Sequence, residues 1–312
     1  MARVDGIGVA FCGGGFRSFA EVAAIEDMDR NGIRIGAVAG TSMGALVAVL
    51  AGAGLPASQI ADLLIKMDQR VVDEGVLRNI KLKAIGLLGG VNGLVDSSIL
   101  ERFARDILDE AGVKTMDDMK MPVALPACDI VSGDLCVFTN DSSLFSDADG
   151  GWTCLTGNLD LARCITASAS YPLVISPTEY LGRTFMDGGC RMNLPTPLFD
   201  RSQVDAVVGV GMVKHAQPTS DLSPLSIAKR TMSCGANQLD RIYSQVADIY
   251  INLPVSGDDA FQAGTGRQVI AEARQMIVDR PVDWSHAKPT ALEAVRRAAV
   301  DALSRMVRTH TD

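Results

Sequence analysis

A serine lies between two glycines at the point where an apolar run gives way to a helical pattern. The residues are Gly40-Thr41-Ser42-Met43-Gly44, within the stretch AVAGTSMGALVAVL. A sharp turn from a strand into a helix needs unusual backbone angles, and glycines two positions either side of the serine remove side chains that would clash. The helix that follows directs its N–H groups and positive dipole end toward the atom under attack. Ser42 is therefore the candidate nucleophile, and the alternative is a glycine-rich turn with an ordinary capping serine.

A carbonyl attacked by a serine becomes an oxyanion, and residues 12–18, CGGGFRS, offer hydrogen-bond donors for its charge. Gly13, Gly14 and Gly15 present backbone N–H groups with no side chains in the way, and one such donor lowers a barrier by about 3 kcal/mol. A dinucleotide-binding loop is the alternative. It is disfavoured because Ser18 replaces the third glycine of G-x-G-x-x-G and no acidic residue ends the next predicted strand.

Arg17 is the cationic residue of this glycine loop. A guanidinium at that place favours recognition of a substrate phosphate or bracing of the loop, and a surface ion pair is the plain alternative.

The serine also needs a base, and Asp187 in TFMDGG is the best-placed carboxylate. It ends a predicted strand, and Gly188 and Gly189 allow its loop to approach another loop closely. Partial desolvation raises the pKa of a carboxyl from about 3.9 toward the working pH. His215, which follows AVVGVGMV, is the one histidine placed as a hydrolase histidine would be. A triad of Ser42, Asp187 and His215 therefore stays open beside a Ser–Asp dyad, as does Asp187 as a plain turn residue.

The elements that must position these residues alternate between strand and helix. This order predicts a parallel sheet with right-handed crossovers, in a three-layer α/β/α fold with a mostly parallel central sheet. We expect strands over 6–12, 33–40, 180–189, 204–213 and 247–254, a hairpin over 121–140, and helices over 18–32, 43–55, 57–67, 97–112, 159–170 and 226–246.

Length and composition limit the class of protein. The chain has 312 residues, of which 47% are hydrophobic, and this is ample for a buried core. We expect one domain over 1–284, with a helical tail over 285–312 packed on it. A net charge of −8 makes nucleic acid an unsuitable partner. No apolar run reaches 18 residues and no secretory leader is evident, so we expect a cytoplasmic protein.

The seven cysteines are scattered, and none forms a C-x-x-C pair. Reduced thiols are therefore expected, and the three histidines lie too far from any cysteine pair to predict a metal site. The segment 76–95 is apolar, rich in glycine and contains two lysines. It is either an interfacial lid that brings the protein into peripheral contact with a membrane or a loosely packed connection between core helices.

Three motifs occur in the same chain: GGGFRS after the first predicted strand, GTSMG after the second, and DGG much later in the sequence. The combination resembles the patatin-like phospholipase family, whose cytosolic phospholipase A2 relatives share the glycine-loop and serine arrangement. Other segments of the chain also resemble those of the family: PACDIVSGDLCVF, ITASASYPLVISPTEYLGRTFMDGGCRMNLPTPLF and ADIYINLP. The resemblance covers about residues 5–280. Ser18 departs from the family pattern, which usually ends the first motif with glycine.

The resemblance implies that Ser42 is the nucleophile of a Ser–Asp dyad and Asp187 its base. It implies an oxyanion hole at Gly14 and Gly15, with Gly13 shaping the loop, and puts Arg17 at the family's basic position, where it would contact substrate. The implied reaction is acyl hydrolysis of a membrane phospholipid or lysophospholipid through an acyl-serine, without a metal or other cofactor. Two other functions stay open: a general esterase of the α/β-hydrolase type that uses the His215 triad, and a non-catalytic lipid-binding regulatory protein of the same fold.

Overall fold

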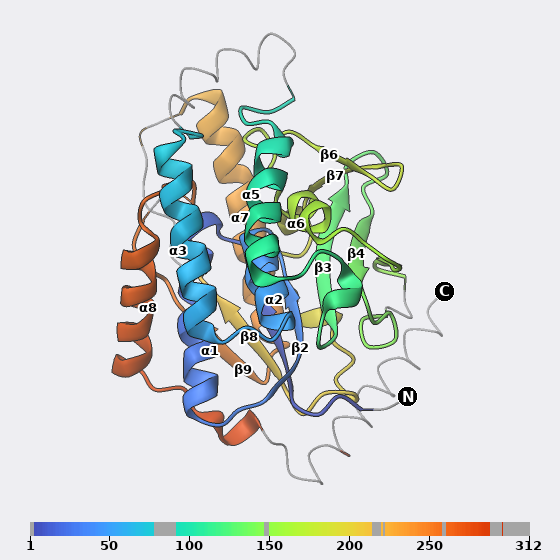
Figure 1. Ribbon diagram of the computed structural model, residues 1–312, viewed down its shortest axis with the longest axis vertical. Helices are drawn as coiled ribbons and strands as arrows, with labels where there is room; N and C mark the ends of the chain where they lie inside the picture. The colour runs from blue at the N-terminus through green and yellow to red at the C-terminus, as the bar shows by residue number, and fades with distance from the viewer. Residues whose placement is uncertain are drawn as a thin grey trace.

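A nine-stranded sheet forms the centre of the computed structural model, which describes residues 3–77, 92–146, 150–213, 220, 222–257, 260–287 and 295. Its main path runs in the order β5-β4-β3-β2-β1-β8-β9, and β6 and β7 lie off this path (Figure 1). The strands are β1 (Ile7–Phe11), β2 (Ile35–Gly40), β3 (Val123–Asp129), β4 (Leu135–Thr139), β5 (Thr153–Leu155), β6 (Thr178–Tyr180), β7 (Arg183–Asp187), β8 (Val207–Gly211) and β9 (Ile249–Asn252).

The middle of the sheet is parallel, as the alternation of strands and helices predicts. β1 pairs in parallel with β2 and β8, β2 with β3, and β8 with β9. The antiparallel pairs are β3 with β4, β3 with β7, and β6 with β7. Because the parallel strands all end at one edge of the sheet, the loops after β1 and β2 come together there.

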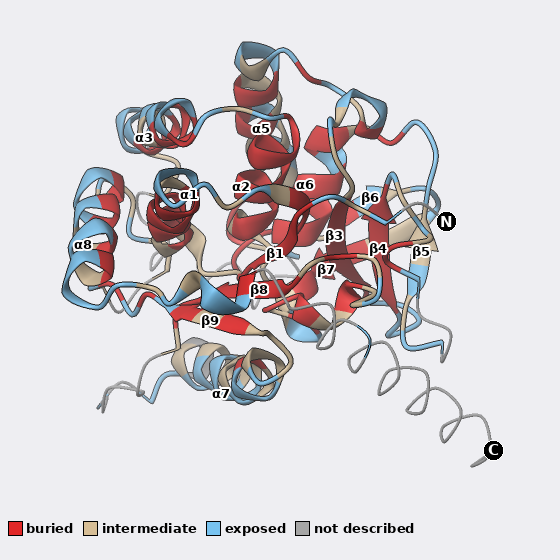
Figure 2. Ribbon diagram, turned by 90° about the horizontal axis from the view of Figure 1, so that it is seen from below, coloured by how far each residue is buried: buried red, intermediate tan, exposed pale blue. Residues whose placement is uncertain are grey.

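Helices cover the sheet unequally. α1, α2, α6 and the more distant α3, α5 and α8 lie on one face, and α7 lies on the other (Figure 2). α2 is the central helix, and all its residues from Gly44 to Gly52 are buried. The helices are α1 (Glu21–Arg30), α2 (Met43–Gly52), α3 (Ala57–Asp73), α5 (Ser97–Ala111), α6 (Leu161–Ala169), α7 (Pro224–Ser244) and α8 (Gly266–Asp279).

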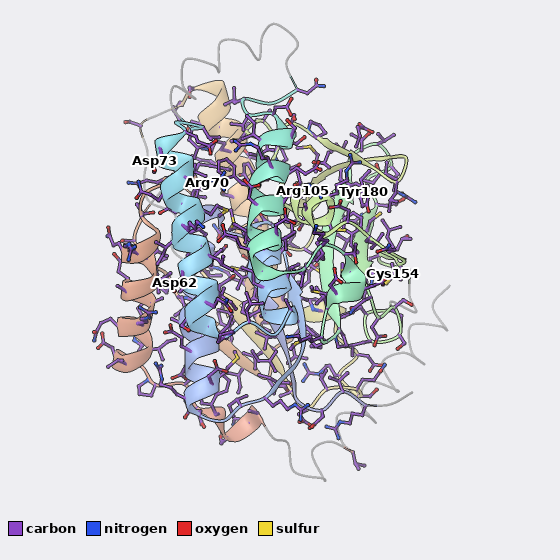
Figure 3. The ribbon with its side chains drawn as sticks, viewed as in Figure 1. Asp62, Arg70, Asp73, Arg105, Cys154 and Tyr180 are labelled. Carbon is purple, nitrogen blue, oxygen red and sulfur yellow. The ribbon has the colours of Figure 1, made fainter. Side chains whose placement is uncertain are left out.

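The core lies between the sheet and its helices, where β1, β3, β4 and β8 are buried along their whole length (Figure 2). Such strands lack the alternation of a half-exposed sheet because both of their faces are covered. On the solvent-exposed side, ion pairs link neighbouring helices. Arg70 of α3 lies between α3 and α5 (Figure 3) and its guanidinium contacts Asp106 at 2.9 Å.

The predicted fold class is confirmed, and some of its parts were not foreseen. α8 was missed, although Val269, Ile270, Ala273 and Ile277 form its buried stripe. The short strands β5 and β6 were also missed. The predicted helical tail over 285–312 and the segment 76–95 lie mainly outside the described residues. In the described part of the chain, no helix combines the length and hydrophobicity needed to cross a membrane, and none of the seven cysteines forms a disulfide.

Candidate active site

Ser42 lies on a sharp turn between the end of β2 and the start of α2. Its backbone angles are φ +56° and ψ −127°, in a region that a residue with a side chain rarely adopts. A Cβ atom on Gly40 would lie 2.1 Å from the Gly44 carbonyl oxygen, and one on Gly44 would lie 2.6 Å from the Cys12 carbonyl oxygen. Both glycines of G-x-S-x-G are therefore required by backbone packing, as the sequence predicts.

Asp187 approaches this turn because β2 and β7 share one edge of β3. Residues Val123 and Ala124 of β3 pair with β2, and Ala127 to Asp129 pair with β7, which runs in the opposite direction. The C-terminal ends of β2 and β7 therefore point toward each other. The gap between them is closed by Gly188, where a Cβ atom would lie 2.2 Å from the Pro126 carbonyl oxygen and 3.2 Å from the Thr41 methyl group.

The Asp187 carboxyl is buried, with 2% of the residue exposed. Oδ1 accepts a hydrogen bond from the Gly189 N–H at 2.7 Å. Burial raises the pKa of Asp187 from 3.8 to about 6, against the opposing effects of the Ser42 hydroxyl and the Gly189 N–H. Within the described residues Oδ2 has no fully formed hydrogen bond, although the Ser42 hydroxyl is near enough to lower the pKa. In the absence of substrate, hydrogen bonds at catalytic sites are often long or poorly aligned, and they tighten when substrate binds.

The glycine loop after β1 lies directly against the serine, since a Cβ atom on Gly13 would be 3.0 Å from Ser42 Cβ. The N–H of Gly13 is occupied, because it donates to the Asn193 carbonyl oxygen at 3.2 Å. The next two amides differ: in the described part of the chain no backbone carbonyl accepts from Gly14 or Gly15. Within the described residues, these two N–H groups therefore have no backbone partner beside the serine.

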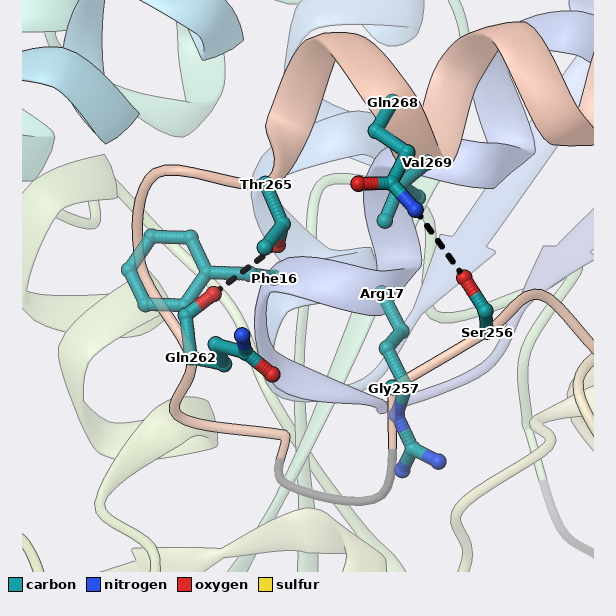
Figure 4. Close-up of a pocket in the computed structure, with 8 residues that line it drawn as sticks. All are labelled: Phe16, Arg17, Ser256, Gly257, Gln262, Thr265, Gln268 and Val269. Carbon is teal, nitrogen blue, oxygen red and sulfur yellow. Dashed lines mark hydrogen bonds between the residues drawn. The ribbon is translucent and has the colours of Figure 1, made fainter.

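Arg17 also contacts the glycine loop. Its Nε donates to the Gly14 carbonyl oxygen at 3.3 Å. The side chain lines a pocket between the glycine loop and α8, and it extends alongside Gly257, away from Gln268 (Figure 4). Ser18 closes the same loop, since its buried hydroxyl donates to the Cys12 carbonyl oxygen at 3.1 Å. This contact explains how a serine is accommodated at that position.

Ser168 of α6 is a site residue that sequence reasoning missed. Its buried hydroxyl accepts from the Ser42 N–H at 3.0 Å and donates to the Pro126 carbonyl oxygen at 2.7 Å. It thus ties the backbone of the serine turn to β3, the strand that also holds β7. The available signal was the run of small residues in ITASAS, where a buried helix carries hydroxyl groups.

The triad alternative depends on His215. His215 lies outside the described residues. His286 is exposed on a short 3-10 helix (Trp284–Ala287), far along the chain from either motif.

Comparison with known proteins identifies the family of this chain. The family model described as patatin-like phospholipase matches residues 9–200, which include Ser42 and Asp187. The chain belongs to the patatin-like phospholipase family. The family that the sequence predicts is confirmed, and membership of it supports lipid ester hydrolysis as the general class of chemistry.

Similar proteins are known from several organisms. The chain is 27% identical over 216 residues to the uncharacterised protein YqhO of Bacillus subtilis, covering 66% of this chain and 70% of YqhO. It is 26% identical over 219 residues to the uncharacterised NTE family protein Rv1063c of Mycobacterium tuberculosis, covering 70% of this chain. The match spans about half of that relative, 52% of its length.

Among solved structures, VipD from Legionella pneumophila aligns with 89% of this chain and 66% of its own, at 13% identity and a TM-score of 0.44. The type III effector protein ExoU aligns with 89% of this chain and 53% of its own, at 14% identity and a TM-score of 0.42.

Proposed function

We propose that this patatin-like protein is a lipid acyl hydrolase of the phospholipase A or lysophospholipase type, with Ser42 as nucleophile and Asp187 as its base. The observation that supports this most is the buried Asp187 carboxyl beside the Ser42 hydroxyl. Its pKa of about 6 leaves it ionised at neutral pH and still basic enough to take a proton.

Each residue then has one task in the first half of the reaction. The Ser42 oxygen attacks the ester carbonyl while Asp187 takes the hydroxyl proton. The carbonyl oxygen becomes an oxyanion, and the N–H groups of Gly14 and Gly15 hold its charge. Collapse of this intermediate breaks the ester bond, and Asp187 returns the proton to the departing alcohol, which leaves an acyl-serine.

The second half repeats these steps with water. Asp187 takes a proton from the water that attacks the acyl-serine, and the same amides hold the second oxyanion. Ser42 then leaves with the proton from Asp187, and a carboxylic acid is released. The strained backbone of Ser42 supports this assignment, because such angles cost about 1–3 kcal/mol and persist where the surrounding structure imposes them. We assign Gly13 to shaping the loop, since its N–H is already bonded.

A product analysis with mixed-lipid vesicles tests this function. Wild-type protein should release free fatty acid from phospholipid or lysophospholipid, and Ser42→Ala should release none above background. His215→Ala separates the dyad from the triad: near-normal turnover supports the dyad, and a loss of at least about 10³-fold would indicate the triad. Absence of any ester hydrolysis by the wild type, with Ser42 inert to a serine-directed probe, would favour the non-catalytic alternative.

A further inference from the structure

One acidic residue outside the dyad is buried close to the glycine loop. Asp240 belongs to α7, which lies on the opposite face of the sheet from the other labelled α-helices (Figure 2). Among the α7 residues whose side chains are described, Asp240 alone is buried, with 5% exposed. A carboxyl group rarely occupies such a place unless it is bonded.

The partner of Asp240 is Asn193, which follows the DGG motif. Asp240 Oδ2 accepts from Asn193 Nδ2 at 2.8 Å. The same Nδ2 donates to the Gly13 carbonyl oxygen at 3.2 Å, and the Asn193 backbone carbonyl accepts from the Gly13 N–H at 3.2 Å. Asn193 therefore holds both polar backbone groups of Gly13, and Asp240 holds Asn193.

The Gly13 carbonyl matters because of the peptide that it begins. In a trans peptide the carbonyl oxygen and the N–H of the next residue point in opposite directions, and the described part of the chain contains no cis peptide. Fixing the Gly13 oxygen toward Asn193 therefore fixes the Gly14 N–H away from it. A peptide between two glycines turns easily, since neither residue has a Cβ atom to restrict it.

We propose that Asp240 is a positioning residue that acts through Asn193 to hold the Gly13–Gly14 peptide in the orientation that presents the Gly14 N–H. This inference rests on the proposed function for its catalytic consequence, while the hydrogen bonds that carry it are independent of that function. α7 thereby contributes to the site although none of its residues belongs to the three sequence motifs.

The charge of Asp240 suits this task. An ionised carboxylate only accepts hydrogen bonds, so it selects the orientation of Asn193 in which the NH2 group faces both Asp240 and Gly13. Burial raises the pKa of Asp240 to about 6, opposed by the Asn193 side chain and the Leu194 backbone, so the group is ionised at pH 8.

The experiment compares Asp240→Leu, which removes the acceptor, with Asp240→Asn, whose side-chain oxygen can still accept. Kinetics on a short water-soluble ester at pH 8 should show kcat lower by about 30- to 100-fold for Asp240→Leu, with KM within about twofold, because part of one oxyanion donor is lost. Asp240→Asn should stay within about fivefold of the wild type. Asp27→Leu is the matched control, since Asp27 is also buried and bonds Trp284 Nε1 at 2.8 Å, outside the site.

A second measurement does not depend on activity. Hydrogen–deuterium exchange of a peptide that covers residues 12–16 should be faster in Asp240→Leu than in wild type, and unchanged in Asp240→Asn and Asp27→Leu. If Asp240→Leu does not fold, Asn193→Ala removes the same bridge and should give the same result.

Unchanged exchange and kcat in Asp240→Leu would overturn the proposal. So would equal losses in Asp240→Leu and Asp27→Leu, which would indicate a general effect on stability. If the wild type hydrolyses no ester, the proposed function fails, and the exchange measurement alone still decides whether Asp240 positions the loop.

Discussion

Ser42 and Asp187 lie beside each other because the C-terminal ends of β2 and β7 meet along one edge of β3. β2, which is parallel to β3, leads to the Ser42 hydroxyl, and β7, which is antiparallel to β3, ends at the Asp187 carboxyl. The two residues are 145 positions apart in the chain. Ser42 lies two residues beyond the end of β2, Asp187 is the last residue of β7, and both strands pair with β3. The two strand pairings therefore fix the relative positions of the hydroxyl and the carboxyl.

The pH dependence of hydrolysis should report the ionisation of Asp187. Only the ionised carboxyl can take the serine proton, and its pKa is raised to about 6 by burial. We expect kcat/KM for a neutral soluble ester to rise about tenfold per pH unit below 6 and to level off above it. Initial rates between pH 4.5 and 8, with circular dichroism to verify folding, provide the test. A flat profile across this range would contradict the assignment of Asp187 as the base.

The same pKa shift has a consequence for stability. The folded protein binds the Asp187 proton more tightly than the unfolded chain, whose ordinary pKa is about 3.8. The stability that this group contributes is therefore complete below pH 4 and is lost as the pH rises through about 6. Asp187→Asn should increase the free energy of unfolding by on the order of 2–3 kcal/mol at pH 8 while it abolishes turnover. Urea denaturation at pH 4 should show little difference between the variant and the wild type.

Replacement of Ser168 by alanine should weaken both the fold and the reaction. The change leaves the Ser42 N–H and the Pro126 carbonyl without the partners they have now, at a cost of about 1–3 kcal/mol for each buried group. Because the serine turn loses its tie to β3, kcat should also fall. Ser170→Ala is the matched control: that buried hydroxyl on the same segment bonds Thr166 and Thr178, away from Ser42. Equal kcat values for the two variants would show that Ser168 is only structural.

The glycines of the serine turn should tolerate no side chain. A methyl group on Gly44 would lie 2.6 Å from the Cys12 carbonyl oxygen and 2.8 Å from that of Phe11, so β1 or α2 would have to move. We expect Gly44→Ala to lower the melting temperature markedly and to displace the glycine loop. Gly235→Ala on α7 is the control, since nothing lies within 4 Å of the added atom, and it should stabilise the helix by about 0.5–1 kcal/mol. Similar melting temperatures for both variants would refute the packing argument.

The sequence was sufficient for the parts of the molecule whose chemistry is local. A glycine on each side of Ser42 and three glycines after the first strand indicate tight turns, because backbone angles and close approach restrict those positions directly. The alternation of elements then predicted the parallel sheet, and parallel strands carry their loops to a common edge. Ser42 accordingly lies at that edge, whereas Asp187 reaches it at the end of the antiparallel strand β7.

The contributions of Ser168 and Asp240 could not be predicted in the same way. Ser168 bonds residues 126 and 42 positions away in the chain, and Asp240 bonds a residue 47 positions away. No short sequence motif encodes pairings of this length. The antiparallel course of β7 along β3 is likewise a long-range pairing. α8 is different, because its apolar residues follow helical spacing within residues 266–279. This helix was therefore predictable from its own sequence.

The most direct test of the Ser–Asp dyad is covalent labelling by a fluorophosphonate, followed by intact-mass measurement and peptide mapping. With Ser42 as nucleophile and Asp187 as its base, we expect one adduct per wild-type chain, located on Ser42, no adduct on Ser42→Ala and labelling at least about 10²-fold slower in Asp187→Asn. Labelling of Asp187→Asn at the wild-type rate, or an adduct on a different serine, would show that these two residues do not form the dyad.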